Sequence, residues 1–316
     1  MKRALITGAS GFVGRHLASY LQEKGFEIWA SAHKRTARFP FRVHWIKADL
    51  SRFDDCLQLI RKSKPDFIFH LAAQTVPQEA WKQPAKSFQL NVGVSISLLE
   101  AILRLAPKAR SLWVSSAQVY GATFLEKVSV REDDVTNPVS PYGGSKLLME
   151  MAVLDFARRH DLSVTIARGT NQVGRGQPET GVFSDFSRRI ALIEAKRAAP
   201  VLATGNLNVV RDFLPVKDAV RAYYLLALRG KRGECYNVSS GKGIQVREGL
   251  RFLVSQSQAP FKIRVLRSRF RKNDFPRMVA NPMRLKRLGW RPQENLRRAL
   301  QELLEEWRGK VSAGLV

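Results

Sequence analysis

The chain has 316 residues, of which 45% are apolar and 25% charged, values typical of a globular protein with room for a main domain and a smaller one. No apolar run approaches the ~18 residues of a membrane span, and no signal-peptide core is recognisable, so neither is expected. Cys56 and Cys235 stand alone and the histidines form no ligand pattern, which favours reduced thiols, a cytoplasmic location and no metal site.

The charge of the chain is strongly positive, because 53 Lys and Arg oppose 27 Asp and Glu to give a net charge of +26. Such density is found in nucleic-acid-binding proteins, on solvated helix faces and around sites for anionic small substrates. The segment 262–298 is especially basic. No zinc-finger, RNA-recognition or basic-zipper pattern accompanies these cations, so we do not expect nucleic acid to be the partner.

The first half of the chain alternates short apolar runs with helical patterns. The runs are apolar throughout, as in parallel strands that are covered on both faces. Strands are predicted at Ala4–Thr7, Glu27–Ala30, Val43–Lys47, Phe67–Leu71, Leu112–Ser115 and Val164–Ala167, and helices at Phe12–Lys24, Phe53–Lys62, Ala85–Leu105 and Tyr142–His160. This alternation predicts an α/β fold with a Rossmann-type, doubly wound parallel sheet.

The pattern becomes irregular after about Arg168. A loop is followed by a helix near Phe183–Lys196, and "CYNVSS" (235–240) has the composition of a strand that returns to the sheet. We therefore predict a dinucleotide-binding domain at 1–170, to which 202–240 partly returns. The segments 171–201 and 241–316 are predicted to form a smaller substrate-binding lobe.

A glycine-rich turn follows the first predicted strand and opens the first predicted helix. "TGASGFVG" places three glycines where the backbone must approach a pyrophosphate at the positive end of a helix. Further small or polar residues follow the third and fourth strands, where the adenine and the nicotinamide ribose are expected. The predicted cofactor contacts are Gly8, Ser10, Gly11, Phe12, Val13, Gly14, Asp49, Leu50, Leu71, Ala72 and Ala73.

The end of the second strand indicates which dinucleotide is bound. NAD sites usually have an acidic residue there for the ribose 2′-hydroxyl, but this chain has Ala32. Lys34 and Arg35 follow, and two cations would attract a 2′-phosphate. The sequence therefore favours NADP(H), with NAD(H) as the alternative.

"SPYGGSK" places Tyr142 and Lys146 one turn apart at the start of a predicted helix. A phenol has a pKa of about 10 and exchanges protons poorly at neutral pH, but a nearby ammonium favours the phenolate. The lysine can also hold the nicotinamide ribose beside the phenol, so Tyr142 and Lys146 are predicted cofactor contacts as well. Two hydroxyl residues, Ser115 and Ser116, end the fifth predicted strand.

These motifs resemble the extended short-chain dehydrogenase/reductase family over essentially the whole chain. The resemblance rests on "TGASGFVG", "HLAAQ", Asn91, "SSAQVYG", "PYGGSK" and "RDFLPVKD". It implies catalysis by Ser116, Tyr142 and Lys146, with Asn91 steadying the helix beside the site. It also implies a homodimer formed through the helices Ala85–Leu105 and Tyr142–His160.

The turn after the fifth strand separates the reactions of this family. Its sugar-nucleotide dehydratases have an acidic residue where Ala117 and Gln118 stand here, and Gln118 cannot exchange a proton. Elimination is therefore disfavoured. Epimerases remain an alternative, but they keep NAD without net redox change, whereas a preference for NADP points to a cofactor consumed in each turnover. Ketone reduction therefore fits the sequence best. An epimerase or dehydratase is the alternative, and a nucleic-acid-binding protein on a Rossmann scaffold fits less well.

The second half is most similar to the GDP-4-keto-6-deoxy-D-mannose reductases, which make GDP-D-rhamnose. The likeness implies NADPH-dependent reduction of the C4 ketone of a GDP-4-keto-6-deoxyhexose to GDP-D-rhamnose or its C4 epimer. The substrate contacts that it implies are Asn171, Val182, Arg188, Asn206, Arg211 and Arg271. The chain departs from that pattern in "RGTNQVGRGQ", where Gln172 replaces a histidine and Arg175 a proline.

Overall fold

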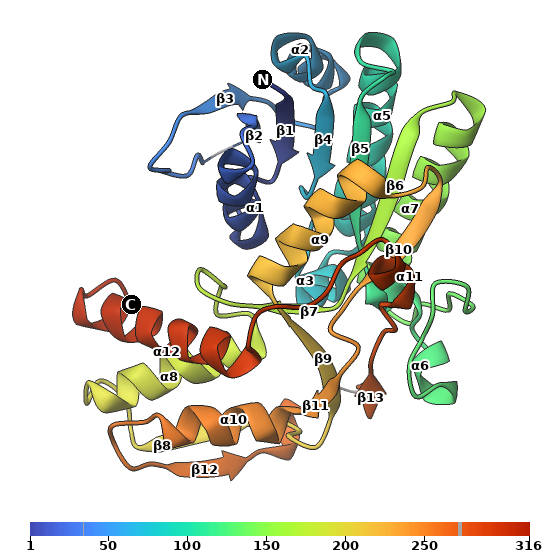
Figure 1. The fold of residues 1–316 in the computed structure, drawn as a ribbon. Helices are drawn as coiled ribbons and strands as arrows, with labels where there is room; N and C mark the ends of the chain where they lie inside the picture. Colours follow the sequence, from blue (N-terminus) through green and yellow to red (C-terminus); the bar gives the residue numbers. More distant parts are fainter. Residues whose placement is uncertain (34, 271–273) are drawn as a thin grey trace.

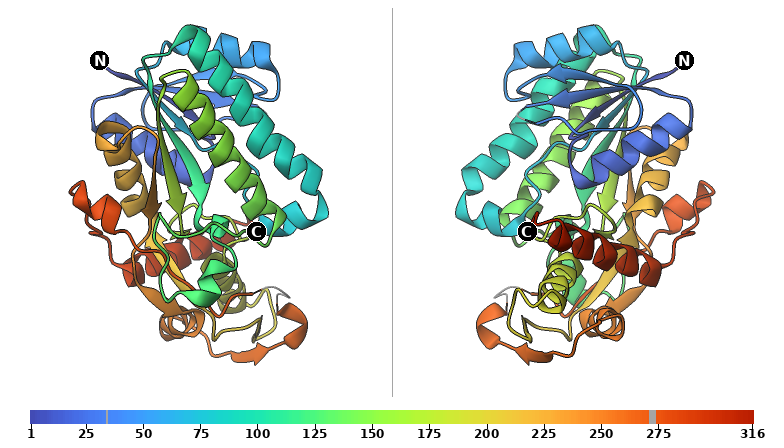
Figure 2. Two further views of the ribbon diagram at one scale, coloured as in Figure 1. Left: turned by 90° about the vertical axis from the view of Figure 1, so that its right-hand side faces the viewer. Right: turned by 90° about the vertical axis from the view of Figure 1, so that its left-hand side faces the viewer.

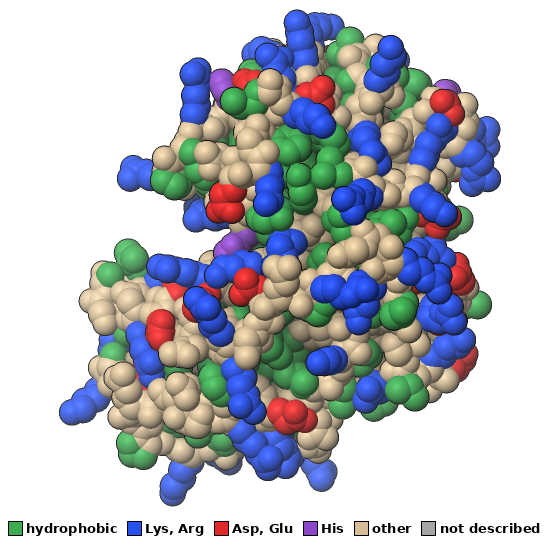
Figure 3. Space-filling view, viewed as in Figure 1, with side chains coloured by type: hydrophobic (Ala, Val, Ile, Leu, Met, Phe, Trp, Pro, Cys, Tyr) green, Lys and Arg blue, Asp and Glu red, His purple; other side chains and the backbone are tan. Residues whose placement is uncertain are grey.

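The computed structural model describes residues 1–33, 35–270 and 274–316 (Figure 1). The predicted contacts Lys34 and Arg271 lie outside the described residues. Two units are visible in Figure 1: a parallel sheet with helices on both faces, and a smaller lobe beneath the carboxyl edge of its strands. Lys and Arg side chains are spread over both units on the face shown in Figure 3.

In the described part of the chain, the main sheet has seven parallel strands in the order β10-β6-β5-β4-β1-β2-β3. The order reverses between β1 and β4, which is the switch point where open α/β sheets bind ligands. The strands are β1 (Arg3–Thr7), β2 (Glu27–Ala32), β3 (Val43–Lys47), β4 (Phe67–His70), β5 (Arg110–Ser116), β6 (Ser163–Gly169) and β10 (Glu234–Val238). The predicted doubly wound parallel sheet is confirmed.

Helices bury both faces of this sheet, which explains why its strands are apolar throughout. On one face lie α1 (Phe12–Glu23) and α9 (Val216–Arg229), whose Leu17, Leu21 and Leu226 join one core cluster. The other face is covered by α2 (Phe53–Ser63), α5 (Val94–Leu105) and α7 (Pro141–Arg159), which form a second cluster. Figure 2 shows α5 and α7 side by side.

The helix that leads into α5 is long and contains an irregular turn. α4 (Pro84–Phe88), the π-helical turn η1 (Gln89–Gly93) and α5 run on continuously from Pro84 to Leu105. By length and composition alone, this helix could cross a membrane, and the described residues contain one such helix. Several of its apolar residues, including Leu98, Leu99 and Ile102, lie in the core under the sheet.

The smaller lobe has its own core between three helices and short strands. Its elements are α8 (Val182–Glu194), α10 (Val246–Ser255) and α12 (Leu296–Ser312), with β8 (Val201–Thr204) paired to β12 (Lys262–Val265), and β9 (Val210–Pro215) paired to β7 (Asn171–Val173), β11 (Gly243–Gln245) and β13 (Arg277–Met278). Within 202–240, β8 and β9 belong to the lobe, whereas α9 and β10 pack with the main sheet.

The remaining short elements lie between the longer ones along the chain. They are α3 (Pro77–Lys82) after β4, the 3-10 turn η2 (Ala117–Val119) and α6 (Thr123–Glu126) after β5, the 3-10 turn η3 (Arg267–Arg269) in the lobe, and α11 (Met283–Arg287) beside β10. The segments that follow β4, β5 and β6 therefore face the lobe across the carboxyl edge of the sheet.

Candidate active site

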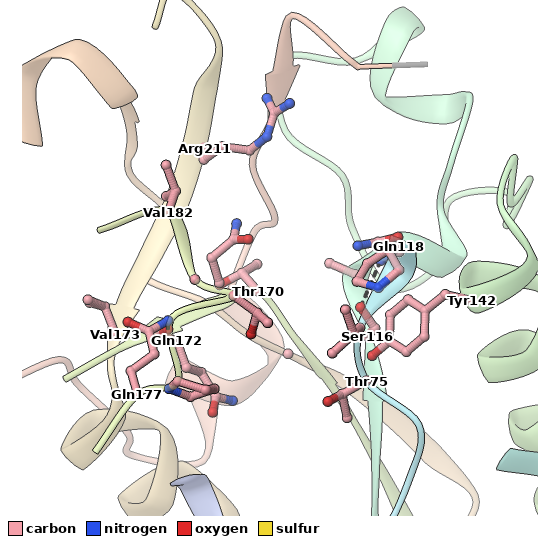
Figure 4. Close-up of a pocket in the computed structure, with 18 of the residues that line it drawn as sticks. Thr75, Ser116, Gln118, Tyr142, Thr170, Gln172, Val173, Gln177, Val182 and Arg211 are labelled. Atoms are coloured by element: carbon pink, nitrogen blue, oxygen red, sulfur yellow. Dashed lines mark hydrogen bonds between the residues drawn. The ribbon is translucent and has the colours of Figure 1, made fainter. Parts of the chain in front are cut away.

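A cavity of about 1520 Å³ extends between the sheet's carboxyl edge and the lobe. This exceeds the 300–1,000 Å³ typical of a site for one small ligand, so two ligands have room. One end is lined by the glycine turn after β1, the middle by Ser116 and Tyr142, and the far end by Arg211 and Arg269 from the lobe. Figure 4 shows Ser116, Gln118 and Tyr142 on one wall, facing residues that follow β6.

The turn after β1 fits a dinucleotide pyrophosphate. Gly8 has a φ of 76°, and a Cβ on Gly14 would lie 2.2 Å from the Gly8 carbonyl oxygen, so α1 can begin this close to the strand only with glycines. The helix has no acidic residue in its first turn and no side-chain cap. Its N–H groups and positive end are thus available to an anion.

The structure brings together most of the predicted cofactor contacts. Those lining the cavity are Gly8, Ser10, Gly11, Phe12, Val13, Gly14, Leu71, Ala72, Ala73 and Tyr142. Four others do not line it: Arg35, Asp49, Leu50 and Lys146. Asp49 lies beside β2, with its carboxylate accepting hydrogen bonds from Ser51 and lying 3.7 Å from the His33 ring. Ala32 is buried at the end of β2.

Ser116 and Tyr142 are hydrogen-bonded in the wall of the cavity. Ser116 ends β5, and its Oγ also accepts the backbone N–H of Gln118 at 3.2 Å. Burial raises the pKa of Tyr142 to about 12, and the hydrogen bond from Ser116 opposes this only in part. The expectation that an ammonium lowers this pKa is therefore not met in the structure, because desolvation of the phenolate dominates.

Lys146 is buried behind Tyr142, one turn along α7. Its Nζ donates a hydrogen bond to the Val114 carbonyl oxygen at 2.8 Å, which holds the helix against β5. Burial lowers the pKa of Lys146 to about 8, and the charge of Glu150 opposes this shift. Lys146 is thus directed at the end of β5.

Asn91 connects the loop after β4 to α7 from within the π-helical turn. Its Oδ1 accepts the N–H of Gln74 at 2.8 Å, and its Nδ2 donates to the Ser145 hydroxyl at 2.9 Å. The side chain is buried. These bonds fix the loop that lines the cavity relative to the helix that bears Tyr142, which is the steadying role expected from the sequence.

Gln118 occupies the position where an acid would stand in a dehydratase. Its side-chain oxygen accepts a hydrogen bond from Ser140 at 3.4 Å, and Ser140 also accepts the Gly143 N–H as the N-cap of α7. Gly143 is required at this contact, since a Cβ there would lie 2.7 Å from the Gln118 carbonyl oxygen. The amide side chain of Gln118 lies beside Tyr142 (Figure 4).

Four of the predicted substrate contacts line the cavity: Asn171, Val182, Asn206 and Arg211. Arg211 is ion-paired with Asp274, which also lines it. Arg188 does not line the cavity, because α8 directs its guanidinium to Glu179 at 3.0 Å and Asp185 at 3.6 Å.

Among the residues that the sequence did not single out, Tyr223, Arg269 and Trp81 also line this cavity. Tyr223 lies on α9 within "RAYYLL", which has the pattern of an ordinary buried helix. Trp81 is 55% exposed on α3, an unusual degree for an indole. The positions of Tyr223 and Arg269 depend on contacts between elements far apart in the sequence, and no local motif marks them.

The chain is similar to known proteins over nearly its full length. It is 32% identical to a GDP-6-deoxy-D-mannose reductase of Pseudomonas aeruginosa, with 98% of each chain covered. It is 30% identical to a UDP-glucose 4-epimerase of Azospirillum brasilense, over 93% of this chain and 88% of the other. The solved structure of RMD from Pseudomonas aeruginosa complexed with NADPH superposes with a TM-score of 0.86 at 30% identity, covering 98% of this chain and 100% of the other.

The family comparison agrees with the glycine turn, the Tyr142–Lys146 pair and the sheet order. Residues 4–239 match the model of the NAD dependent epimerase/dehydratase family, and this range includes all seven strands of the main sheet. The resemblance to extended short-chain dehydrogenases/reductases predicted from the sequence is confirmed. The chain belongs to the NAD dependent epimerase/dehydratase family.

Proposed function

We propose that this protein is an NADPH-dependent reductase of the C4 ketone of a GDP-4-keto-6-deoxyhexose, giving GDP-D-rhamnose or its C4 epimer. The observation that carries the proposal is Gln118 beside Tyr142 in the cavity wall. Dehydration needs a group that takes and returns a proton at this point, and an amide does neither. The similarity to a GDP-6-deoxy-D-mannose reductase over 98% of both chains supports the same activity.

The residues of the site can supply the proton that a ketone reduction requires. When bound, NADPH supplies a hydride to the ketone carbon. Ser116 hydrogen-bonds the ketone oxygen and Tyr142 gives that oxygen its proton. Burial raises the pKa of Tyr142 to about 12, so the phenol holds its proton at neutral pH and can still give it to the developing alkoxide, which is the stronger base. The hydrogen bond from Ser116 favours the phenolate that remains.

NADP(H) rather than NAD(H) is supported by the absence of an acid at the end of β2. Ala32 is 8% exposed there, and Arg35 is exposed on the following segment. A 2′-phosphate would meet no repulsion at Ala32 and would be attracted by Arg35. The glycine turn and the uncapped start of α1 would hold the pyrophosphate. The relative crystallised with NADPH favours the same cofactor.

The far end of the cavity suits a nucleotide diphosphate. Arg211 and Arg269 line it together with Asn206 and the aromatic Phe275. Guanidinium groups pair well with diphosphate oxygens, and Arg211 is held by Asp274 from within the lobe. Asn171, the first residue of β7, also lines the cavity, and its amide suits contact with the hexose.

The proposal is tested with purified protein, NADPH and freshly made GDP-4-keto-6-deoxymannose. We expect NADPH oxidation matched by one equivalent of a GDP-6-deoxyhexose, whose C4 configuration is read by NMR. Conversion of GDP-mannose to the 4-keto sugar, or turnover of a UDP-hexose without added NADPH, would instead assign a dehydratase or an epimerase. The similarity to a UDP-glucose 4-epimerase makes the second control necessary.

We further propose a cytoplasmic homodimer. Apolar side chains lie on the outer faces of two neighbouring helices, with Ile96 of α5 38% exposed and Leu148 and Met151 of α7 46% and 58% exposed. Exposed apolar side chains on neighbouring helices are typical of an interface between subunits. Cys56 and Cys235 are both buried and unpaired, which agrees with a reducing compartment.

A further inference from the structure

Two side chains from distant parts of the chain form a hydrogen bond in the wall of the cavity. Tyr223, from α9, is buried in the wall of the cavity, and its hydroxyl oxygen lies 2.5 Å from Nε2 of Gln172 in β7. Both residues line the same cavity as Ser116 and Tyr142. Burial raises the pKa of Tyr223, and ionisation of the nearby Tyr142 would raise this pKa further.

The pair has hydrogen-bonding capacity that the described residues do not use. As placed, Gln172 donates to Tyr223, which leaves the hydroxyl proton of Tyr223 and the side-chain oxygen of Gln172 without a partner among the described residues. If the amide were turned over, Tyr223 would donate to Gln172 and an amide N–H would be left over. In either orientation the pair presents one donor and one acceptor side by side, and leaving such groups unsatisfied on ligand binding is costly.

The position of the pair limits which ligand group it can meet. It lies at Gly169, the last residue of β6, where a Cβ would come within 3.3 Å of Gln172 Nε2 and 3.4 Å of the Tyr223 hydroxyl. Gly169 is the direct neighbour of Ser116 in the sheet. The pair is therefore one strand away from the serine that binds the reacting oxygen. In Figure 4, Gln172 and Arg211 lie on opposite sides of Thr170.

In ketone reduction the hydride is added to the carbonyl carbon and the proton to the carbonyl oxygen. Because Ser116 and Tyr142 meet that oxygen, the nicotinamide ring has to lie close to them, over the ends of β5 and β6. The ring carbon next to the hydride-bearing carbon bears a primary carboxamide, with one acceptor oxygen and a donor NH₂. We propose that Gln172 and Tyr223 bind this carboxamide and so fix the face that the nicotinamide presents to the substrate. The inference rests on the proposed function only in requiring a nicotinamide cofactor.

The absence of a side chain at Gly169 agrees with this role. A Cβ there would approach both members of the pair and the Ser115 carbonyl oxygen at 3.9 Å, so it would fill the space into which the pair opens. The backbone of the segment is fixed from two sides, since the Gln172 carbonyl oxygen accepts a hydrogen bond from Gln177 at 2.8 Å and Asn171 donates to the Asp212 carbonyl oxygen at 3.1 Å. The pair is thus held in place before a ligand arrives.

The test measures cofactor binding without substrate, by titration calorimetry or quenching of tryptophan fluorescence. The ligands are NADPH and its reduced 3-acetylpyridine analogue, in which a methyl group replaces the carboxamide NH₂. We expect wild-type protein to bind the analogue about tenfold more weakly, as the loss of one hydrogen bond in a desolvated site predicts. Gln172→Leu should bind NADPH about tenfold more weakly and distinguish it little from the analogue.

Tyr223→Phe removes only the hydroxyl and should weaken both ligands about tenfold, because the acetyl group keeps the carbonyl oxygen. The matched control is Tyr224→Phe, the next residue on α9, whose ring packs edge-on against Tyr20 away from the cavity. It should bind both ligands like wild type. A third ligand, 2′-phospho-ADP-ribose, lacks nicotinamide and should bind wild type and Tyr223→Phe equally.

Three results would overturn the inference. One is equal weakening of 2′-phospho-ADP-ribose and NADPH by Tyr223→Phe, which would indicate a general structural effect. Another is a Gln172→Leu variant that still binds NADPH more tightly than the analogue by the same factor as the wild type. The third is unchanged NADPH affinity with weaker binding of GDP-hexose, which would assign the pair to the sugar. If the protein binds NADPH normally but does not reduce the proposed substrate, the substrate assignment is wrong. The role of Gln172 and Tyr223 in binding the carboxamide would not be affected by that result.

Discussion

At the scale of single residues, burial decides the acid–base properties of the site. Tyr142 and Lys146 are one turn apart on α7, yet their pKa values move in opposite directions, to about 12 and about 8. The cause is common to both, because a buried site disfavours the phenolate and the ammonium alike. Both residues are thus shifted toward their neutral forms. The neutral phenol of Tyr142 can donate a proton, and Lys146 loses its charge at mildly alkaline pH.

Replacing Tyr142 with Phe should remove the proton donor and little else. We expect kcat to fall by roughly 10²–10⁴-fold, the usual contribution of a positioned general acid. NADPH affinity, measured by fluorescence titration, should change little because the ring remains. A variant that retains most of its turnover would show that another group delivers the proton.

The pH dependence should report Lys146. Because its pKa in the folded protein is about 8, the ammonium is lost as pH rises through that value, and we expect kcat to decline above about pH 8. A lysine whose folded pKa is depressed below its unfolded value of 10.5 stabilises the fold at high pH and loses that contribution as pH falls through about 8. Unfolding of this origin cannot therefore cause the decline. A pH profile that is flat to pH 9.5 would contradict the prediction, and circular dichroism over the same range provides the control.

At the scale of secondary structure, α7 connects the site to a buried ion pair. Glu150 follows Lys146 by one turn and accepts a bidentate interaction from Arg168 of β6, with Nη2 at 2.7 Å. Arg168 also donates to the Tyr120 hydroxyl at 3.0 Å, so η2, α7 and β6 are joined around one guanidinium. The ion pair thereby ties the middle of the helix bearing Tyr142 to β6.

Removing one member of this pair should be costly. Arg168→Leu would leave the Glu150 carboxylate buried at 2% exposure without its cation, and we expect the free energy of unfolding to drop by about 3–5 kcal/mol. Urea unfolding followed by circular dichroism measures this. The double variant Arg168→Leu with Glu150→Met should recover much of the loss, because no unpaired charge remains. A single variant within ~0.5 kcal/mol of wild type would exclude a structural role for the pair.

At the scale of the whole molecule, the site lies between two separately packed units and beneath a basic surface. The unit built around the main sheet supplies the glycine turn, Ser116 and Tyr142, and the lobe supplies Arg211 and Arg269. Both proposed ligands are polyanions, and the net charge of +26 attracts them. The wide distribution of cations in Figure 3 suits this long-range role better than a local nucleic-acid groove.

Salt should therefore weaken capture of the substrate. Between about 20 mM and 500 mM NaCl we expect kcat/KM for the nucleotide sugar to fall progressively, because screening shortens the reach of surface charges. The value of kcat at saturating substrate should change little and serves as the control. Insensitivity of kcat/KM to salt would show that the surplus cations do not steer the substrate.

The dimer is tested by charging the outer face of α7. Leu148→Glu with Met151→Glu should convert the dimer to monomer in size-exclusion chromatography with light scattering, because two carboxylates would have to be buried in the interface. The matched control is Leu125→Glu with Val128→Glu, two apolar residues that are 63% and 74% exposed elsewhere. A wild-type protein that is already monomeric would exclude the interface.

The sequence by itself determined what local spacing controls. Alternating apolar runs predicted the parallel sheet, and the glycines of "TGASGFVG", the Tyr142–Lys146 spacing and the neutral Gln118 indicated the chemistry, because turns and single helices bring close neighbours together. Tertiary structure decided what depends on distant contacts. It placed Tyr223 against Gln172, turned Arg188 toward Glu179, and buried Tyr142 deeply enough to raise its pKa. Desolvation and packing arise only when elements far apart in the chain meet, so no local pattern records them.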